Sequence, residues 1–234
     1  MITTVLFDLD GTLLPMDQDV FINAYMGALA KKMAPYGYDP KRLLASIWKG
    51  TAAMVQNIGD QGNEDVFWAA FSEAYGRDLR SDEGLFLEFY QNEFQTVSGS
   101  CGKDPRAAQT IQALKEMGYT LALATNPLFP SIATYSRCKW AGLDPKDFAL
   151  ITTYENSSRC KPNPDYYREV LDKLGVQAEH CLMVGNDVAE DMIAEKLGMK
   201  VFLLTDCLIN KHNTDISRYP NGSFPELLEY VRSL

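Results

Sequence analysis

Two aspartates stand two residues apart where the first apolar run of the chain ends. The run is Val5-Leu6-Phe7, and Asp8, Leu9 and Asp10 follow it before Gly11. In an extended segment alternate side chains point the same way, so the two carboxylates lie on one side, and the glycine lets the backbone turn away sharply. Because aspartate is depleted in strands, the pair is hard to explain as packing. It predicts a site for a divalent cation and an anionic substrate.

Three further polar stretches follow, each at the end of an apolar run or the start of a helical pattern. They are Thr125-Asn126 after the run 119–124, Cys160-Lys161-Pro162-Asn163-Pro164-Asp165, and Gly185-Asn186-Asp187-Val188-Ala189-Glu190-Asp191 after the run 181–184. Each has a structural alternative. Thr125 could cap a helix, and Lys161 could stand at a proline-marked helix entrance. Asp187 and Asp191 could complement a helix dipole. The occurrence of all four stretches in one order favours a functional interpretation.

In this order the four stretches resemble the four motifs of the haloacid dehalogenase superfamily, whose members are mostly magnesium-dependent phosphohydrolases. Asp8-Leu9-Asp10-Gly11-Thr12 is similar to the first motif, Thr125 to the second, Lys161-Pro162-Asn163-Pro164 to the third, and the acidic stretch from Gly185 to the fourth. The resemblance implies an α/β fold with a Rossmann-like, doubly wound parallel sheet as its core. In such open sheets ligands bind beyond the carboxyl ends of the strands, where all four motifs fall.

The resemblance also implies a Mg²⁺-dependent phosphatase that hydrolyses a small phosphomonoester through an aspartyl-phosphate. Asp8 would be the nucleophile, and Asp10 would protonate the leaving oxygen and later activate water. Lys161 would offset negative charge, while Thr125 and the Asn126 amide would donate hydrogen bonds to phosphate oxygens. For its role Asp10 must hold a proton near neutral pH, and a neighbouring carboxylate together with partial burial would raise its pKa.

The implied cofactor is Mg²⁺, which prefers oxygen ligands. The expected metal-site residues are Asp8, Asp10 through its backbone carbonyl, Asn186, Asp187 and Asp191. In the commonest fourth motif the residue after the glycine is Asp, whereas this chain has Asn186 there and Asp187 next. Either Asp187 holds the cation or Asn186 supplies a neutral amide oxygen. We favour Asp187, because a carboxylate contributes charge to the cation and an amide only a dipole.

A helical pattern separates the first motif from the second. Apolar residues recur at helical spacing over residues 21–33, 44–58, 67–75 and 86–94, with breakers between these ranges. Four amphipathic helices joined by short turns would form a small α-helical bundle, and its position resembles that of the cap in one branch of the superfamily. We expect a core of residues 1–15 and 103–234 and a cap of residues 16–102. The aromatic side chains of the cap are expected to form its core rather than a pocket.

From residue 103 onward apolar runs alternate with helical patterns, as in a parallel sheet with helices on both faces. Strands are expected over residues 2–7, 119–124, 150–153, 181–184 and 200–204. Helices are expected over residues 105–117, 129–141, 164–174, 188–197 and 225–232. The stretch 206–220 is interpreted as a surface excursion without an assigned function.

Composition narrows the class of protein. A chain of 234 residues, 46% of them hydrophobic, can bury a core domain with a small insert, and no stretch is apolar enough to span a membrane. A net charge of −9 argues against general affinity for nucleic acid. The five scattered cysteines include no C-x-x-C pair and are expected to be reduced. We expect a cytoplasmic monomer or homodimer that binds a small phosphorylated molecule and neither nucleic acid nor a membrane.

Other reactions on this fold stay open. A haloacid dehalogenase uses a single nucleophilic aspartate, so Asp10 argues against dehalogenation. A phosphonatase needs a cap lysine that forms a Schiff base, and each available lysine is better explained as a solvated helix charge. The available lysines are Lys31, Lys32, Lys41 and Lys49. A sugar phosphomutase would keep the same core residues. A non-catalytic binding protein would not need the four catalytic residues intact.

Overall fold

β1 (Thr4–Phe7) lies at the centre of the sheet in the computed structural model, which describes residues 1–234. It pairs in parallel with β2 (Thr120–Leu123) on one side and with β4 (Cys181–Gly185) on the other. The outer strands are β3 (Leu150–Ile151), β5 (Lys200–Leu204) and β6 (Asn221–Gly222), and the order is β3-β2-β1-β4-β5-β6. All neighbouring strands are parallel. Such a sheet must be covered on both faces, and all four side chains of β1 are buried.

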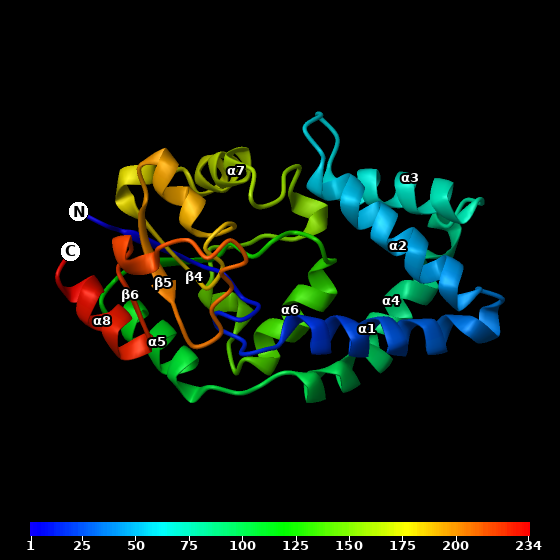
Figure 1. The fold of residues 1–234 in the computed structure, drawn as a ribbon, viewed down its shortest axis with the longest axis horizontal. Helices are drawn as coiled ribbons and strands as arrows, with labels where there is room; N and C mark the ends of the chain where they lie inside the picture. Colours follow the sequence, from blue (N-terminus) through cyan, green and yellow to red (C-terminus); the bar gives the residue numbers. More distant parts are fainter.

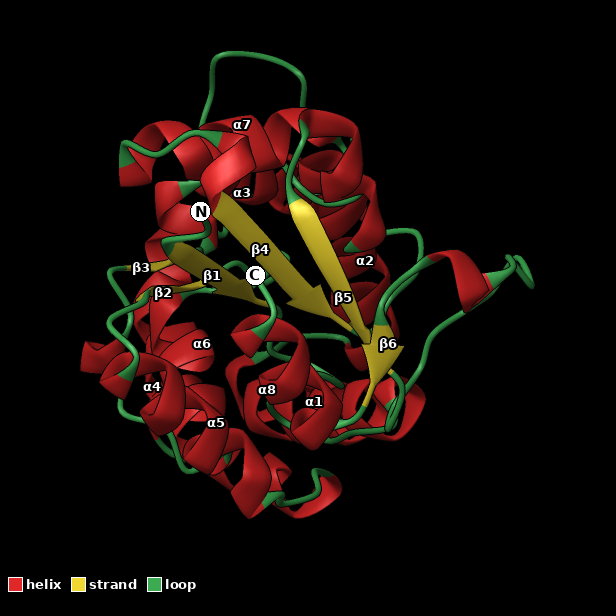
Figure 2. Ribbon diagram, turned by 90° about the vertical axis from the view of Figure 1, so that its left-hand side faces the viewer, coloured by secondary structure: helices red, strands yellow, loops and turns green.

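Helices pack against both faces of the sheet, as Figure 2 shows. The core helices are α5 (Pro105–Glu116), α6 (Ser131–Trp140), α7 (Pro164–Leu174) and α8 (Phe224–Arg232). Val5 and Phe7 point toward α5 and α8, with which they share one buried cluster. Leu6 points to the opposite face and belongs to a second cluster with residues of α7. The alternation of side chains along β1 therefore fills two cores, and the expected doubly wound α/β fold is confirmed.

The segment between β1 and α5 contains helices and turns but no strand, and its helices lie to one side of the sheet (Figure 1). It contains α1 (Gln18–Met33), α2 (Pro40–Val55), α3 (Asn63–Tyr75), α4 (Glu83–Gln91) and a 3₁₀-helix at Glu93–Ser100. Asp17 and Asp39 cap α1 and α2, because their side chains accept hydrogen bonds from first-turn backbone N–H groups. The four expected helices are present and share their own hydrophobic cluster.

The aromatic residues of these helices differ in their exposure to solvent. Phe71, Phe89 and Phe94 are completely buried, as expected of core positions. Trp48 is 49% exposed, although its spacing on α2 predicts a buried residue. Trp48 and several other rings line a cavity, so the expectation that the aromatic residues form only a core is wrong in part.

Two adjacent segments connect the helical region to the sheet. Met16 and Cys101 form an antiparallel bridge, and the Gly102 N–H donates to the Pro15 carbonyl at 2.7 Å. A glycine at 102 suits this close approach, because a Cβ there would lie 3.0 Å from Cβ of Pro15. The outgoing and returning chains therefore support each other at the junction.

A second set of contacts joins the helical region to the core far from this junction. The Asn63 side-chain amide at the start of α3 donates to the Arg159 carbonyl at 3.2 Å, and its backbone N–H donates to the Ser157 carbonyl at 2.8 Å. The Arg159 guanidinium in turn donates to the carbonyls of Ile58 and Gly59. These contacts hold the α2–α3 turn against the loop that precedes Lys161.

The acidic stretch that follows β4 does not have the expected helical structure. A helix over 188–197 is wrong, because the chain forms turns after β4 and then a 3₁₀-helix at Met192–Leu197. The Asp187 N–H donates to the Asp191 side chain at 2.9 Å, and the Val188 N–H donates to the Ile209 carbonyl at 3.0 Å. These two hydrogen bonds stabilise the turns that stand where the expected helix would begin.

The stretch 206–220 runs mostly along the surface, as expected, but it also contacts the loop after β4. Ile209 forms a parallel bridge with Asp187, and its N–H donates to the Asn186 carbonyl at 2.9 Å. Tyr219 is buried against the α7 face of the sheet. The segment therefore buttresses the loop after β4. No helix combines the length and the apolar character that a membrane crossing requires.

Candidate active site

The four polar stretches meet at the carboxyl ends of the three central strands. Asp8 follows β1 directly, Thr125 lies just beyond β2, and Asn186 follows β4. Because β1 pairs with both β2 and β4, these ends lie side by side. They line one cavity of about 160 Å³. Of the expected site residues, this cavity is lined by Asp8, Asp10, Thr125, Asn126, Asn186, Asp187 and Asp191.

Lys161 joins this group as a buried cation. Its ammonium donates to Asp8 Oδ1 at 2.9 Å and to Asp191 Oδ1 at 2.7 Å, and the residue is 1% exposed. Burial disfavours the charged form, but Asp191 and Asp8 outweigh it and hold the pKa of Lys161 well above its usual value. Removal of one partner from such a buried pair leaves an uncompensated charge. Lys161 therefore fixes Asp8 and partly neutralises it.

Asp10 has a cationic partner that the motifs do not contain. Its carboxylate pairs with the guanidinium of Arg137 on α6, which is 1% exposed and stacks 4.3 Å from the ring centroid of Phe129. Burial raises the pKa of Asp10, the Arg137 guanidinium opposes that rise, and Asp8 adds to it. Asp10 Oδ1 has no hydrogen-bond partner. A raised pKa agrees with the expectation for a general acid.

Arg137 was not among the expected site residues, although the sequence contained a signal for it. Arg137 lies on the face of α6 that carries Ala133 and Cys138, both of which are buried. An arginine at such a position must find a buried anion, because an unpaired charge in the interior is costly. The sequence could not show that this anion is Asp10.

Asp8 and Asn186 present two oxygens to one hydroxyl group. Thr12 Oγ1 lies 3.2 Å from Asp8 Oδ2 and 3.0 Å from Asn186 Oδ1. The Asn186 amide nitrogen donates to the Cys207 carbonyl at 2.7 Å, which fixes the amide with its oxygen toward Thr12. One hydroxyl proton cannot satisfy both oxygens. A cation beside them would use the lone pairs of these two oxygens that the single proton leaves free.

Gly11 makes this approach possible. Its φ is +83°, and a Cβ at this position would lie 2.3 Å from the Asn186 amide nitrogen. Both the backbone conformation and the space exclude other side chains there. The glycine of the first motif thus brings the loops after β1 and β4 together.

The remaining acids of the fourth stretch have distinct partners. Asp187 Oδ1 accepts from the Ala189 N–H at 2.7 Å and the Glu190 N–H at 3.0 Å, so this oxygen closes the local turn. Asp191 is 1% exposed and holds Lys161 on one oxygen and the Asp187 N–H on the other. Burial raises the pKa of Asp191, and the Lys161 ammonium opposes that rise. Both oxygens of Asp191 are therefore engaged within the protein.

Asn126 positions the backbone of Lys161. Its side-chain oxygen accepts from the Lys161 N–H at 3.2 Å, and its amide donates to Glu190 Oε2 at 3.0 Å. Glu190 also lines the cavity and was not among the expected site residues, although it stands inside the fourth stretch. The Thr125 carbonyl accepts from Thr152 and Tyr166, which holds the Thr125 side chain at the cavity wall.

The balance of charge in the cavity favours a divalent cation. Five carboxylates line it, namely Asp8, Asp10, Asp187, Glu190 and Asp191. Two buried cations, Lys161 and Arg137, pair with three of them. No three acidic, cysteine or histidine side chains form a preformed metal cage. Mg²⁺ suits such a site, because it commonly uses one or two carboxylates together with substrate phosphate and water.

Comparisons with known proteins agree with this geometry. The family model of haloacid dehalogenase-like hydrolases matches residues 2–197. A phosphoglycolate phosphatase of Xylella fastidiosa is 26% identical over 204 residues, which cover 84% of this chain and 77% of the relative. The pyrophosphatase PpaX of Halalkalibacterium halodurans is 23% identical over 235 residues, covering 98% and 97% of the two chains. The crystal structure of a 2-haloacid dehalogenase from Pseudomonas syringae pv. Tomato DC3000 has a TM-score of 0.64 at 22% identity and covers 100% of this chain and 99% of its own.

Because the model match spans most of the chain, the protein belongs to the haloacid dehalogenase-like hydrolase family. It is therefore a hydrolase with a Rossmann-like core. The dehalogenase likeness concerns the fold alone at this level of identity.

Proposed function

We propose that the protein is a Mg²⁺-dependent phosphatase that hydrolyses a small phosphomonoester through an aspartyl-phosphate at Asp8. The observation that carries the proposal is the placement of both aspartates in one cavity, where Lys161 holds Asp8 and burial raises the pKa of Asp10 despite Arg137. Lys161 contacts Asp8, whereas Arg137 contacts Asp10. Two carboxylates in different environments can take different roles, one ionised and one protonated. The relatives named as phosphatases support the same class of reaction.

Asp8 acts as the nucleophile in this proposal. An oxygen of its carboxylate attacks phosphorus, a new O–P bond forms, and the bond from phosphorus to the ester oxygen breaks. Lys161, Thr125 and the Asn126 amide stabilise the negative charge on the phosphoryl oxygens. Because Lys161 already lies 2.9 Å from Asp8, its charge reaches the reacting atoms without rearrangement.

Asp10 moves the protons. In the first step it donates a proton to the leaving oxygen, and in the second it removes a proton from the water that attacks phosphorus. The second step breaks the bond between phosphorus and Asp8 and releases inorganic phosphate. Arg137 orients the Asp10 carboxylate and limits the rise of its pKa.

Mg²⁺ would be held by Asp8 Oδ2, the Asp10 backbone carbonyl and the Asn186 side-chain oxygen. When bound, it would supply positive charge to the phosphoryl oxygens. This choice differs from our sequence-based preference for Asp187. Asn186 is supported because its oxygen converges with Asp8 on Thr12. One oxygen of Asp187 accepts hydrogen bonds from backbone N–H groups, and its other oxygen remains the alternative ligand.

We also propose that residues 16–102 act as a cap over a core of residues 1–15 and 103–234. The helical region contributes Met16, Gln18, Phe21 and Ile22 to the wall of the catalytic cavity. This region has its own hydrophobic cluster and is reached through two adjacent segments. A lid in this position would exclude water and contact the organic part of the substrate.

The alternative of a phosphonatase receives no support. None of its four candidate lysines lines the catalytic cavity. Lys32 is engaged in ion pairs with Glu88 and Glu93 instead. A phosphomutase would use the same core residues, and it differs in producing a phosphorylated isomer rather than free phosphate.

The proposal is tested by phosphate release from a panel of phosphomonoesters. Purified protein should release phosphate with Mg²⁺, lose this activity in excess chelator, and fail to regain it with Ca²⁺, whose looser coordination misplaces the nucleophile. Phosphate release that persists at full rate in chelator contradicts the metal requirement. Conversion of a sugar phosphate into an isomer without phosphate release would indicate the phosphomutase.

A further inference from the structure

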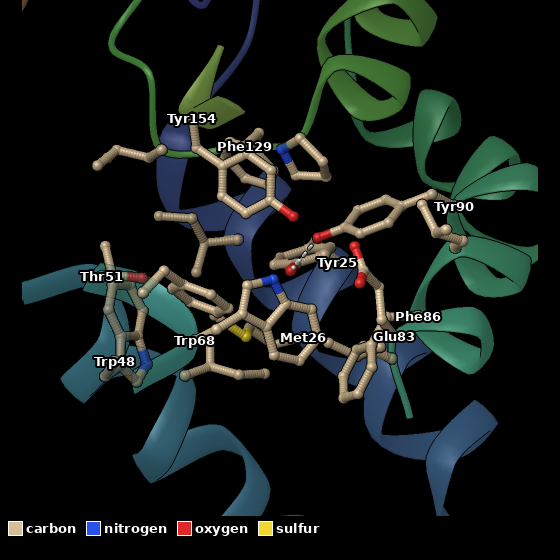
Figure 3. A pocket seen from close by; sticks show the side chains of 17 residues that line it. Tyr25, Met26, Trp48, Thr51, Trp68, Glu83, Phe86, Tyr90, Phe129 and Tyr154 are labelled. Carbon is tan, nitrogen blue, oxygen red and sulfur yellow. Dashed lines mark hydrogen bonds between the residues drawn. The ribbon is translucent and has the colours of Figure 1, made fainter. Parts of the chain in front are cut away.

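A second cavity, of about 120 Å³, is shown in Figure 3. It is formed mainly by the helical region, and residues 128–130 and Tyr154 of the core close it. Ile22, Leu128 and Phe129 line both cavities. The apolar cavity therefore adjoins the place where the organic part of a substrate with its phosphate at Asp8 would lie.

The wall of this apolar cavity is almost free of charge. Fourteen of its 17 lining residues are hydrophobic, and Glu83 is the only charged one. Lys161 and Arg137, the cations of the catalytic cavity, are already paired with carboxylates. A carboxylate or second phosphate on the substrate would find no cation here and would face Glu83. The cavity therefore disfavours anionic leaving groups such as glycolate or phosphate.

The size and shape of the apolar cavity suit one ring or a branched alkyl chain. Apolar protein cavities of about 150 Å³ bind benzene, and this cavity is of similar volume. Its walls are aromatic on several sides, and a 2.9 Å hydrogen bond between the hydroxyls of Tyr25 and Tyr90 fixes one of them. Trp68 packs edge-on against Phe86 at 5.6 Å between ring centroids. Rings in such contacts keep the cavity open in a defined shape.

One polar atom in this wall lacks a partner. Trp68 is 6% exposed, and its Nε1 donates to no group of the protein. The Trp68 indole opposes the rise that burial causes in the pKa of the Tyr154 phenol, yet the two groups do not meet hydrogen-bond geometry. Figure 3 shows both side chains at the cavity. A buried donor without a protein partner is free to donate to a water molecule or to an acceptor on a ligand.

We propose that the apolar cavity binds the organic part of the substrate, and that this part is an uncharged aromatic or branched alkyl group with an oxygen acceptor for Trp68. The inference rests on the proposed phosphatase function and adds the substrate class. It sets this protein apart from its relatives named for phosphoglycolate and pyrophosphate, whose leaving groups are anionic.

The first test compares kcat/KM for 2-phenylethyl phosphate, ethyl phosphate and phosphoglycolate. The first two release primary alcohols of similar acidity, so a difference between them reports binding of the ring. Burial of a phenyl group should favour 2-phenylethyl phosphate over ethyl phosphate by about 100-fold. Phosphoglycolate should be a poorer substrate than 2-phenylethyl phosphate because its carboxylate has no cationic partner.

The second test fills the apolar cavity. Thr51 lines it from α2, and Thr51→Trp should lower the ratio of kcat/KM for 2-phenylethyl over ethyl phosphate by about tenfold. Lys49→Trp places the same side chain at an exposed position of the same helix that does not line the cavity. This control should leave the ratio and the activity unchanged. Equal loss of the ratio in both variants would contradict the assignment.

The third test concerns the Trp68 donor. 2-Phenoxyethyl phosphate and 3-phenylpropyl phosphate differ by an ether oxygen in place of a methylene group. Wild-type protein should prefer the ether, and Trp68→Phe should reduce that preference by about fivefold. A preference that survives Trp68→Phe overturns the predicted acceptor.

The outcomes separate the inference from the proposed function. If ethyl phosphate or phosphoglycolate is hydrolysed as well as 2-phenylethyl phosphate, the substrate class is wrong and the phosphatase stands. If no phosphomonoester releases phosphate in the presence of Mg²⁺, the proposed function fails, and the inference fails with it.

Discussion

The catalytic cavity and the apolar cavity share a wall but are built by opposite means. The catalytic cavity is lined by five carboxylates from loops at the carboxyl ends of strands, and two buried cations, Lys161 and Arg137, pair with three of them. The apolar cavity collects rings from four helices of the inserted region and offers one carboxylate. Charged groups determine the properties of the catalytic cavity, whereas the shape of an apolar wall determines those of the apolar cavity.

This difference indicates that the catalytic cavity governs the rate of the reaction and the apolar cavity governs the choice of substrate. Charges at the strand ends can stabilise a transferring phosphoryl group whatever organic group it carries. An apolar wall discriminates between substrates because it buries their apolar groups and leaves their polar groups unpaired. It adds little to the chemical step. Substitutions in the catalytic cavity should therefore change activity toward all substrates alike, and substitutions in the apolar cavity should change their ranking.

The largest effect is expected from Asp8→Asn. Loss of the nucleophile should reduce phosphate release by about 10⁴-fold or more for every ester of the panel. Asp19→Asn makes the same change at an exposed position on α1 and should have wild-type activity. Substantial metal-dependent turnover by a clean Asp8→Asn preparation would show that Asp8 is not the nucleophile.

A smaller effect should distinguish the two candidate metal ligands. Because the Asn186 oxygen converges with Asp8, Asn186→Ala should raise the Mg²⁺ concentration needed for half-maximal activity by about 10-fold to 100-fold. Asp187→Ala should raise it less, since one of its oxygens closes a turn. Titration of both variants with Mg²⁺ decides the order. The reverse order would restore Asp187 as the ligand, as the sequence alone suggested.

The apolar cavity should respond through selectivity. Trp48→Ala removes a half-exposed wall residue and should lower the preference for 2-phenylethyl over ethyl phosphate by about fivefold, with little loss of stability. Steady-state kinetics with both esters and a thermal melt measure the two effects. An equal fall in kcat/KM for both esters would contradict the assignment of selectivity to the apolar cavity.

The smallest effect concerns the pH profile. Arg137 opposes the rise in the pKa of Asp10 that burial causes, so Arg137→Gln should raise that pKa further. Because protonated Asp10 is the acid, it then stays competent to higher pH, and the alkaline limb of kcat/KM should move to higher pH. Arg137→Lys keeps the charge and should leave the limb near its wild-type position. A downward shift in Arg137→Gln would contradict the role of Asp10 as the acid.

The strand-end residues were predictable because their spacing along the chain reflects the geometry of a parallel sheet. The bounds of β5 and α7 match the expected ranges. Asp8, Thr125 and Asn186 follow three strands whose pairing places them together. Local sequence is informative here, since the apolar run and the polar residue that ends it are adjacent in the chain.

Contacts between distant segments were not predictable in this way. Arg137 is on the apolar face of α6, and nothing in its neighbours indicates Asp10 as the partner. The expected helix from Val188 is replaced by turns, and the Val188 N–H donates to Ile209, in a segment to which no function was assigned. Trp48 has the spacing of a core residue, yet it borders a cavity that only the assembled helices define.

The most direct test of the central claim is to trap the phosphorylated protein. In Asp10→Asn, 4-nitrophenyl phosphate supplies a leaving group that needs no proton, while the water that must discharge Asp8 is no longer activated. Mass spectrometry of the acid-quenched and digested protein should show one added phosphoryl group on the peptide that contains Asp8. Steady release of phosphate by this variant with the Asp8 peptide unmodified at every time point would contradict the account.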